Sequence, residues 1–226
     1  MKFAVCVFPG SNCDYDTYYV IRDLLQQEVS FVDHHTRSLA GFDCVVLPGG
    51  FSFGDYLRAG VLASKTPLGE AIFEFAQRGG LVLGICNGFQ ILTELHLLPG
   101  ALLKNENLRF VCRDVFLRVE NNSLPFTNRF EKDEVVVLPI AHGEGRYYVP
   151  EEELRLMEER GQIVMRYCDE EGKATEEANP NGSVSNIAGV CNREGNVFGL
   201  MPHPERACED LMGYRDGLLL WHSLIA

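Results

Sequence analysis

Residues 81–92 constrain the fold more than any other part of the chain. They begin with a short apolar run, 81–85, pass through Cys86 and continue as an apolar segment with helical spacing. An apolar run of this length, preceded by two glycines, is typical of a buried strand in a parallel sheet. Gly84 and Gly88 flank Cys86 in the G-x-nucleophile-x-G spacing of a sharp strand-to-helix turn. The stretch therefore predicts an α/β fold with a thiol at the carboxyl end of a strand.

This turn would place the sulfur of Cys86 at the amino end of a helix. The helix dipole stabilises a thiolate there by up to about 2 kcal/mol. An oxyanion hole contributes more, because losing one of its donors typically costs about 2.7 to 4 kcal/mol. The backbone N–H of Asn87, the next residue, is the first candidate donor. The alternative is that Cys86 is an inert core cysteine, which is common for this residue type, but the turn spacing favours a nucleophile.

Length and charge limit the class of protein. The chain has 226 residues, 46% of them apolar, which fits a single domain spanning 1–226. A net charge of −12 argues against nucleic-acid binding, which needs clustered Lys and Arg. The apolar run 3–8 ends at Pro9 and is too short for a signal peptide or a membrane span. We therefore expect a soluble, cytoplasmic protein with neither a nucleic-acid nor a membrane partner.

The cysteines predict neither disulfides nor a metal site. None of the eight forms a C-x-x-C pair; they stand at positions 6, 13, 44, 86, 112, 168, 191 and 208. Disulfide frameworks are typical of much smaller secreted chains, so reduced thiols are expected. Zinc sites are usually marked by closely spaced Cys or His pairs, and the chain offers only His34-His35. The sequence therefore predicts no metal.

The first part of the chain alternates strands and helices. The predicted elements are strand 3–8, helix 14–27, strands 29–32 and 44–47, and a helix capped by Thr66, begun by Pro67 and closed by Gly79. This order is typical of a doubly wound, mostly parallel sheet with flanking helices. Folds of this class place their sites at the carboxyl ends of the strands.

The second part departs from this alternation. Apolar and polar side chains alternate from 115 to 120, which predicts an antiparallel excursion of the sheet. The other predicted elements are a strand 135–140, an acidic surface helix 150–160, a hairpin of strands 187–192 and 197–201, and a last helix 210–224.

The loop 48–60 is rich in glycine yet carries Asp55, Tyr56 and Arg58. The chain contains no G-x-x-x-x-G-K-[ST] motif, so this loop is not a P-loop. Glycine lets a backbone N–H approach a ligand closely, and Gly50 is therefore a candidate oxyanion donor. The alternative is that these glycines only form a turn.

A cysteine nucleophile needs a histidine base, and two of the six histidines have a glutamate two residues further on. These pairs are His142 with Glu144 and His203 with Glu205. In an extended backbone, residues i and i+2 point the same way, so either glutamate is placed to bond its imidazole. Prolines on both sides hold His203 extended, whereas glycines leave His142 loose. The spacing leaves both pairs open, and rigidity favours His203.

Several motifs resemble those of the class I, or triad, glutamine amidotransferases, in which Cys, His and Glu occur in this order. Within that family the resemblance is closest to the glutaminase subunits of phosphoribosylformylglycinamidine synthase, a purine-biosynthesis enzyme. The matching segments run from the first strand to the last helix: 8–13, 48–60, 84–90, 141–145, 179–183 and 201–206. The resemblance implies a flavodoxin-like α/β fold.

The resemblance also implies roles for eight positions. Three residues carry the chemistry, two backbone N–H groups form the oxyanion hole, and three residues lie near bound glutamine. In that order they are Cys86 as nucleophile, His203 as general base and acid and Glu205 as its orienting carboxylate, then Gly50 and Asn87, then Gln90, Arg109 and Phe110. The resemblance thus favours His203 over His142.

The implied reaction hydrolyses glutamine to glutamate and hands ammonia to a large synthetase subunit, which works with a small accessory subunit. The synthetase would use ATP and Mg²⁺ to convert formylglycinamide ribonucleotide to the amidine, and this chain is expected to bind no cofactor. His142, Glu144 and the loop 55–58 are candidates for the docking rim. Two alternatives are a catalytically silent scaffold of the same fold and a stand-alone γ-glutamyl hydrolase.

Overall fold

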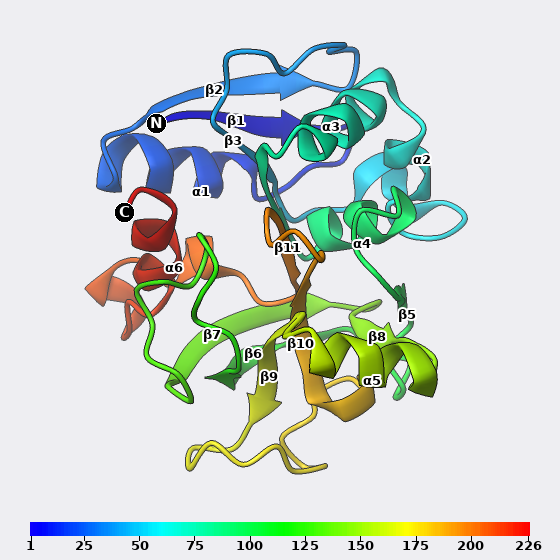
Figure 1. The fold of residues 1–226 in the computed structure, drawn as a ribbon, viewed down its shortest axis with the longest axis vertical. Helices are drawn as coiled ribbons and strands as arrows, with labels where there is room; N and C mark the ends of the chain where they lie inside the picture. Colours follow the sequence, from blue (N-terminus) through cyan, green and yellow to red (C-terminus); the bar gives the residue numbers. More distant parts are fainter.

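The structure is a computed structural model that describes residues 1–226, and a mixed nine-stranded sheet forms its centre (Figure 1). The strand order is β2-β1-β3-β4-β11-β10-β9-β6-β7. Strands from β2 to β11 in this order pair in parallel, and the pairings from β11 to β7 are antiparallel. This sheet confirms the predicted fold class, including the antiparallel excursion.

The parallel half consists of strands that the sequence predicted. They are β1 (Lys2–Val7), β2 (Glu28–Asp33), β3 (Cys44–Leu47), β4 (Leu81–Ile85) and β11 (Val197–Leu200). The inner strands β3, β4 and β11 are buried on both faces, as a parallel sheet between two helical layers requires. The edge strand β2 is largely exposed.

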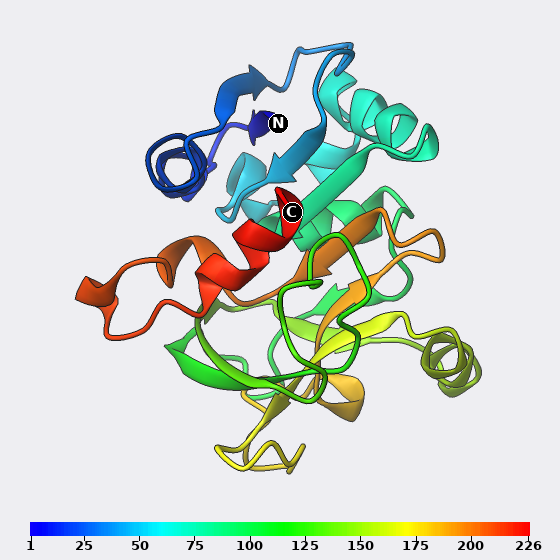
Figure 2. The same ribbon diagram turned by 60° about the vertical axis from the view of Figure 1, so that its left-hand side comes forward.

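Helices cover both faces of the parallel half. Figure 2 shows α1 (Asp14–Tyr19) and α6 (Gly217–Leu224) on one face and α3 (Pro67–Gln77) on the other. The remaining helices are α2 (Val61–Ser64), α4 (Asn87–Glu94) and α5 (Glu151–Glu159). The predicted cap of α3 is confirmed, because Thr66 Oγ1 accepts the Gly69 N–H at 3.1 Å. None of these helices combines the length and the apolar character needed to cross a membrane.

The antiparallel half contains strands that the pattern did not indicate. Its strands are β6 (Val111–Val119), β7 (Val135–His142), β9 (Ile163–Cys168) and β10 (Ile187–Cys191). The predicted strands in this half are confirmed, but β9 was missed, as was a small second sheet of β5 (Ala101–Leu103) and β8 (Arg146–Tyr148). β9 fills the space between β6 and β10, so the excursion is a continuous extension of the main sheet.

Two predicted helices have different boundaries. The helix predicted over 14–27 changes to a π-helical turn at Val20–Leu24. The last helix begins at Gly217 instead of 210, because Gly213 adopts a left-handed conformation with φ 89° that ends a short 3₁₀ turn before it. Leu211, which a helix starting at 210 would have packed inward, is 94% exposed.

The carboxyl ends of β3, β4 and β11 lie side by side because these strands pair in parallel and in register. The chain segments that follow them contain Gly50, Cys86 and His203. The N–H of His203 donates to the carbonyl of Pro139 in β7 at 2.8 Å, so the antiparallel half also holds this edge. The topology thus gathers these predicted site residues at one edge of the sheet.

Helix α4 approaches β3 closely at Gly88, where a Cβ would lie 2.0 Å from the Leu47 carbonyl oxygen. Gly88→Ala is therefore expected to lower the free energy of unfolding by about 3 kcal/mol, measured by urea denaturation. Gly143→Ala is the matched control, because its Cβ meets only Phe110 at 3.8 Å, an ordinary contact. Equal losses in the two variants would contradict the packing argument.

Candidate active site

Cys86 occupies the turn between β4 and α4, as its sequence spacing predicts. Its backbone has φ 50° and ψ −104°, a conformation that L-residues rarely adopt. The turn is held on both sides, since the Cys86 N–H donates to the Leu200 carbonyl at 2.8 Å and its own carbonyl accepts the Gln90 N–H at 3.1 Å. Backbone strain of this kind is found at functional sites, where the surrounding structure maintains it.

His203 and Glu205 form a buried pair at the end of β11. Nδ1 of His203 lies 2.6 Å from Oε1 of Glu205, and the two residues are 2% and 5% exposed. Because a carboxylate only accepts, the Nδ1 atom carries the proton and Nε2 is left free to act as a base. The predicted pairing is correct, but the predicted extended backbone is wrong, because residues 204–206 form a 3₁₀ turn and Glu205 reaches Nδ1 from within it.

The Cys86 thiol is close enough to the imidazole of His203 to influence its pKa. Burial lowers the pKa of His203, but the Glu205 carboxylate and the Cys86 sulfur raise it by more. The pKa of His203 is therefore well above its ordinary value. Nε2 of His203 is buried without a hydrogen-bond partner, and the Cys86 thiol lies 3.8 Å from the Ala141 carbonyl oxygen. A raised histidine pKa favours the imidazolium, which in turn stabilises a neighbouring thiolate.

The two predicted oxyanion donors come from the loop after β3 and from the first residue of α4. Asn87 is the first residue of α4, so its N–H has no acceptor within the helix. Gly50 has φ 152°, and a Cβ there would lie 2.7 Å from the Asn12 nitrogen, so only glycine fits. The hydrogen bonds that fix its loop come from neighbouring residues, with Phe51 N–H donating to Gly10 and Asn12 N–H to Gly49. Their role as oxyanion donors stays a prediction.

The predicted substrate residues lie on two different elements, α4 and the loop before β6. Gln90 is buried beside the turn, and its Nε2 donates to the Glu144 carbonyl at 2.7 Å. Arg109 and Phe110 have exposed side chains, and the Arg109 carbonyl accepts from Asn105 Nδ2 at 2.8 Å. The Phe110 ring approaches Gly143, which joins this loop to the segment after β7.

His142 is placed differently from what its glycine neighbours suggested. It is 3% exposed, and its Nδ1 bonds to Asn105 Oδ1 at 3.1 Å, so it makes no pair with Glu144. Burial first and the neighbouring His203 second lower the pKa of His142 to about 4. The prediction of a loosely held His142 at a docking rim is therefore wrong, because a buried neutral imidazole presents no surface to a partner.

Cys13 also lies at this site, although no role was predicted for it from the sequence. Its sulfur accepts from Arg206 Nη2 at 3.2 Å, and its ligand atom lies within 4.8 Å of those of His203 and Glu205. The segment 8–13 was a motif match at the end of the first strand, and that position at the sheet edge was the available signal. The prediction that the chain binds no metal stays a prediction.

Asp55 gives a pH-dependent test of the loop. Burial, and then the negative Glu144, raise the pKa of Asp55 to about 6, above its ordinary value. Between about pH 4 and 6, Asp55 is therefore protonated in the folded state but ionised in the unfolded state. Above that window Asp55 is ionised in the folded state as well, and its buried carboxylate lowers the free energy of unfolding. Asp55→Asn is expected to raise the melting temperature more at pH 8 than at pH 4.5. An equal gain at both pH values would contradict this assignment.

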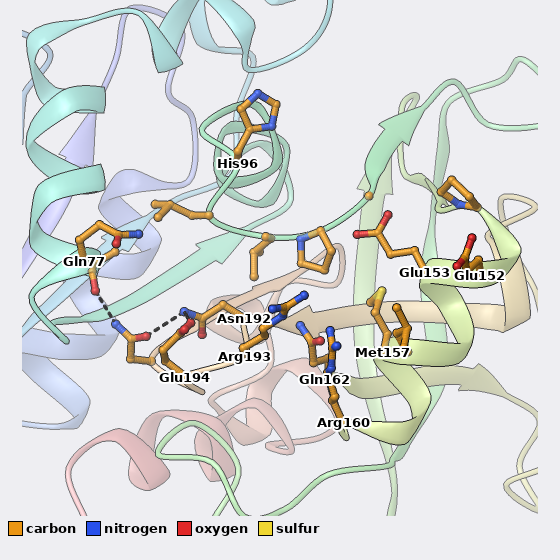
Figure 3. Close-up of a pocket in the computed structure, with 18 of the residues that line it drawn as sticks. Gln77, His96, Glu152, Glu153, Met157, Arg160, Gln162, Asn192, Arg193 and Glu194 are labelled. Atoms are coloured by element: carbon orange, nitrogen blue, oxygen red, sulfur yellow. Dashed lines mark hydrogen bonds between the residues drawn. The ribbon is translucent and has the colours of Figure 1, made fainter.

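A cavity of about 1110 Å³ lies at the opposite edge of the sheet (Figure 3). It is bounded by α5, the turn between β10 and β11 and the end of α4, and its lining includes both positively charged arginines and negatively charged glutamates. None of the predicted site residues lines it. The chemistry therefore belongs to the carboxyl edge, where the thiol, imidazole and carboxylate meet.

A thiol on a strand-to-helix turn, beside a buried histidine–glutamate pair on the adjacent strand of a doubly wound sheet, is the arrangement of the triad glutamine amidotransferases. Residues 1–214 match the family model of the CobB/CobQ-like glutamine amidotransferase domain. The chain therefore belongs to this glutamine amidotransferase family, and within it to the PurQ subunits of phosphoribosylformylglycinamidine synthase, as the relatives that follow show.

The chain is 70% identical over 226 residues to the phosphoribosylformylglycinamidine synthase subunit PurQ of Aquifex aeolicus, and the match covers 100% of both chains. It is 55% identical to the same subunit of Moorella thermoacetica, covering 100% of this chain and 95% of the relative. A solved structure of PurLQS from Thermotoga maritima matches with a TM-score of 0.87 and 45% identity, covering 99% of this chain and 97% of that one. These matches confirm the recognised family.

Proposed function

We propose that this chain hydrolyses glutamine through Cys86, His203 and Glu205. His203 takes the thiol proton at Nε2, and the sulfur attacks the side-chain amide carbon of glutamine. The carbonyl oxygen becomes an oxyanion that the N–H groups of Gly50 and Asn87 stabilise. The buried His203–Glu205 pair beside the Cys86 turn is the observation that carries this proposal.

The second half of the reaction follows from the same geometry. His203 returns its proton to the leaving nitrogen, the carbon–nitrogen bond breaks and ammonia departs, which leaves a γ-glutamyl thioester on Cys86. Water, deprotonated by His203, then attacks the thioester and releases glutamate and the free thiol. Glu205 stabilises the imidazolium in both steps because it bonds the Nδ1 proton.

The ammonia is proposed to serve a synthetase subunit. In bulk water, ammonia is protonated and loses its nucleophilic electron pair, so a productive transfer requires docking near Cys86. The partners proposed are a large synthetase subunit, which would bind ATP, Mg²⁺ and formylglycinamide ribonucleotide, and a small accessory subunit. The solved structure of PurLQS from Thermotoga maritima supports an assembly of this kind.

A reducing, cytoplasmic location is proposed as well. All eight cysteines are free, and seven of them are buried. A working Cys86 thiolate requires the same conditions, because oxidation would remove the nucleophile.

The experiment that tests the proposed function compares nitrogen sources. A synthetase preparation lacking this chain is expected to form the amidine from ammonium salts but not from glutamine, and adding the chain restores the glutamine reaction. A silent scaffold would leave glutamine unused although the complex assembles. A stand-alone γ-glutamyl hydrolase would hydrolyse glutamine equally fast without the partner.

A further inference from the structure

Buried amide side chains form a network of hydrogen bonds that runs from the loop after β3 to the segment after β7. It begins at Asn87, whose Oδ1 accepts the Ser52 N–H at 3.1 Å and whose Nδ2 donates to Gln90 Oε1 at 2.8 Å. Gln90 continues the network, because its Nε2 donates to the Glu144 carbonyl at 2.7 Å. The two amides thus join the loop after β3, helix α4 and the segment after β7.

A third amide fixes the far end of this network. Asn105, which is fully buried, accepts the Gly145 N–H through Oδ1 at 3.0 Å and donates through Nδ2 to the Arg109 carbonyl at 2.8 Å. The same Oδ1 also bonds Nδ1 of His142, so Asn105 holds the segment that carries Glu144 on both sides of that residue. The segment whose Glu144 carbonyl accepts the Gln90 amide is therefore held in place by Asn105.

The polarity of the network leaves one orientation for each amide. Ser52 contributes a backbone N–H, so Asn87 must present its oxygen there and its nitrogen to Gln90. Gln90 must then present its oxygen to Asn87 and its nitrogen to the carbonyl of Glu144. Flipping either amide would place donor against donor or acceptor against acceptor in a buried site. Asn87 and Gln90 are 2% and 5% exposed, so water does not replace these partners.

The loop that this network anchors is the one that contains Gly50. On its other side, Gly49 accepts the Asn12 N–H at 3.2 Å and the Phe51 N–H donates to Gly10 at 2.9 Å. The Asn87 contact to Ser52 holds the loop two residues after Gly50 and ties it to helix α4, which begins at Asn87. The next residue, Phe53, has φ 53°, so an unanchored loop would have strain to release.

We propose that Asn87 and Gln90, through their side chains, are positioning residues that hold the Gly50 N–H in place relative to the Cys86 sulfur. This inference rests on the proposed function. It gives Gln90 a role that differs from direct glutamine binding, because its amide oxygen accepts from Asn87 and its amide nitrogen donates to Glu144.

The test uses Asn87→Leu and Gln90→Met in the complex with the synthetase, since both changes preserve side-chain size and remove the hydrogen bonds. Each variant is expected to lower kcat for glutamine hydrolysis by about 100-fold, the effect of losing one oxyanion donor. Alkylation of Cys86 by iodoacetamide is expected to change by less than about threefold, because that displacement forms no oxyanion. The double variant should lose no more than about threefold beyond either single variant, since one break already releases the loop.

Thr93→Val is the matched control. Thr93 lies in the same helix, and its buried Oγ1 donates to the Gln90 carbonyl at 2.8 Å, so the change removes a buried hydrogen bond but spares the amides. It is expected to keep glutaminase activity within about twofold.

A kcat within threefold of wild type in Asn87→Leu would overturn the inference. Equal losses of alkylation and hydrolysis would also overturn it, because the side chains would then act only through folding. So would a double variant whose losses multiply, because the two side chains would then act independently. A wild-type complex without glutaminase activity would instead overturn the proposed function, and this inference with it.

Discussion

Cys86→Ser abolishes glutamine-dependent amidation by the complex and leaves ammonia-dependent amidation intact. We expect the glutamine rate to fall by about 10⁴-fold or more, as is usual when an enzyme loses its nucleophile. A serine hydroxyl at the same turn stays protonated near neutral pH, and the imidazole of His203 deprotonates it far less readily than a thiol. Steady-state assays with glutamine and with ammonium chloride as alternative nitrogen sources measure both rates.

Cys112→Ser is the control for this variant, because Cys112 is an exposed cysteine on β6. It is expected to leave both rates unchanged. If Cys86→Ser kept its glutamine rate, or if both nitrogen sources failed together, the assignment of Cys86 as nucleophile would be wrong.

Glu205→Gln is expected to lower the glutamine rate by about 10³ to 10⁴-fold, a size known for the comparable change in another triad enzyme. The carboxylate accepts the Nδ1 proton of His203 at 2.6 Å, whereas a glutamine amide offers its N–H group as well. That N–H favours the tautomer whose proton sits on Nε2, and such an imidazole cannot take the proton of Cys86. Losing the Glu205 charge also lowers the pKa of His203, because that charge is the main effect that opposes the lowering by burial.

Glu209→Gln is the matched control for the carboxylate. Glu209 is exposed, follows the same segment and accepts a hydrogen bond from the Tyr19 hydroxyl at 3.1 Å. It is expected to keep the glutamine rate. A Glu205→Gln variant with more than a tenth of the wild-type rate would show that His203 needs no carboxylate partner.

The parallel half of the fold could be predicted because each strand is a local apolar run between glycine-rich turns. β9 could not, because Arg166 interrupts its apolar run and reads as a surface residue. In the folded chain this guanidinium donates to the Ser185 carbonyl and pairs with Glu158. Those partners lie on separate elements, so only the tertiary structure explains how a charge fits within that strand.

The predicted site separates in the same way. Cys86 and the His203–Glu205 pair are set by short spacings, and the structure brings them together at neighbouring strand ends. The surroundings of His142 depend on Asn105 and Asn181, which lie 37 and 39 residues away along the chain. The nearby glycines therefore suggested a loosely held histidine, whereas long-range amide contacts hold it in a buried, neutral state.

The most direct test of the triad is acid quenching of the complex during glutamine turnover, followed by peptide mass spectrometry. With Cys86 as the nucleophile, we expect a γ-glutamyl group on the peptide that contains Cys86, and none on the peptide that contains Cys13, the other thiol beside His203. The group should accumulate as a thioester that hydroxylamine removes. Steady ammonia release with an unmodified Cys86, or with the γ-glutamyl group on Cys13, would contradict the assignment of Cys86 as the nucleophile.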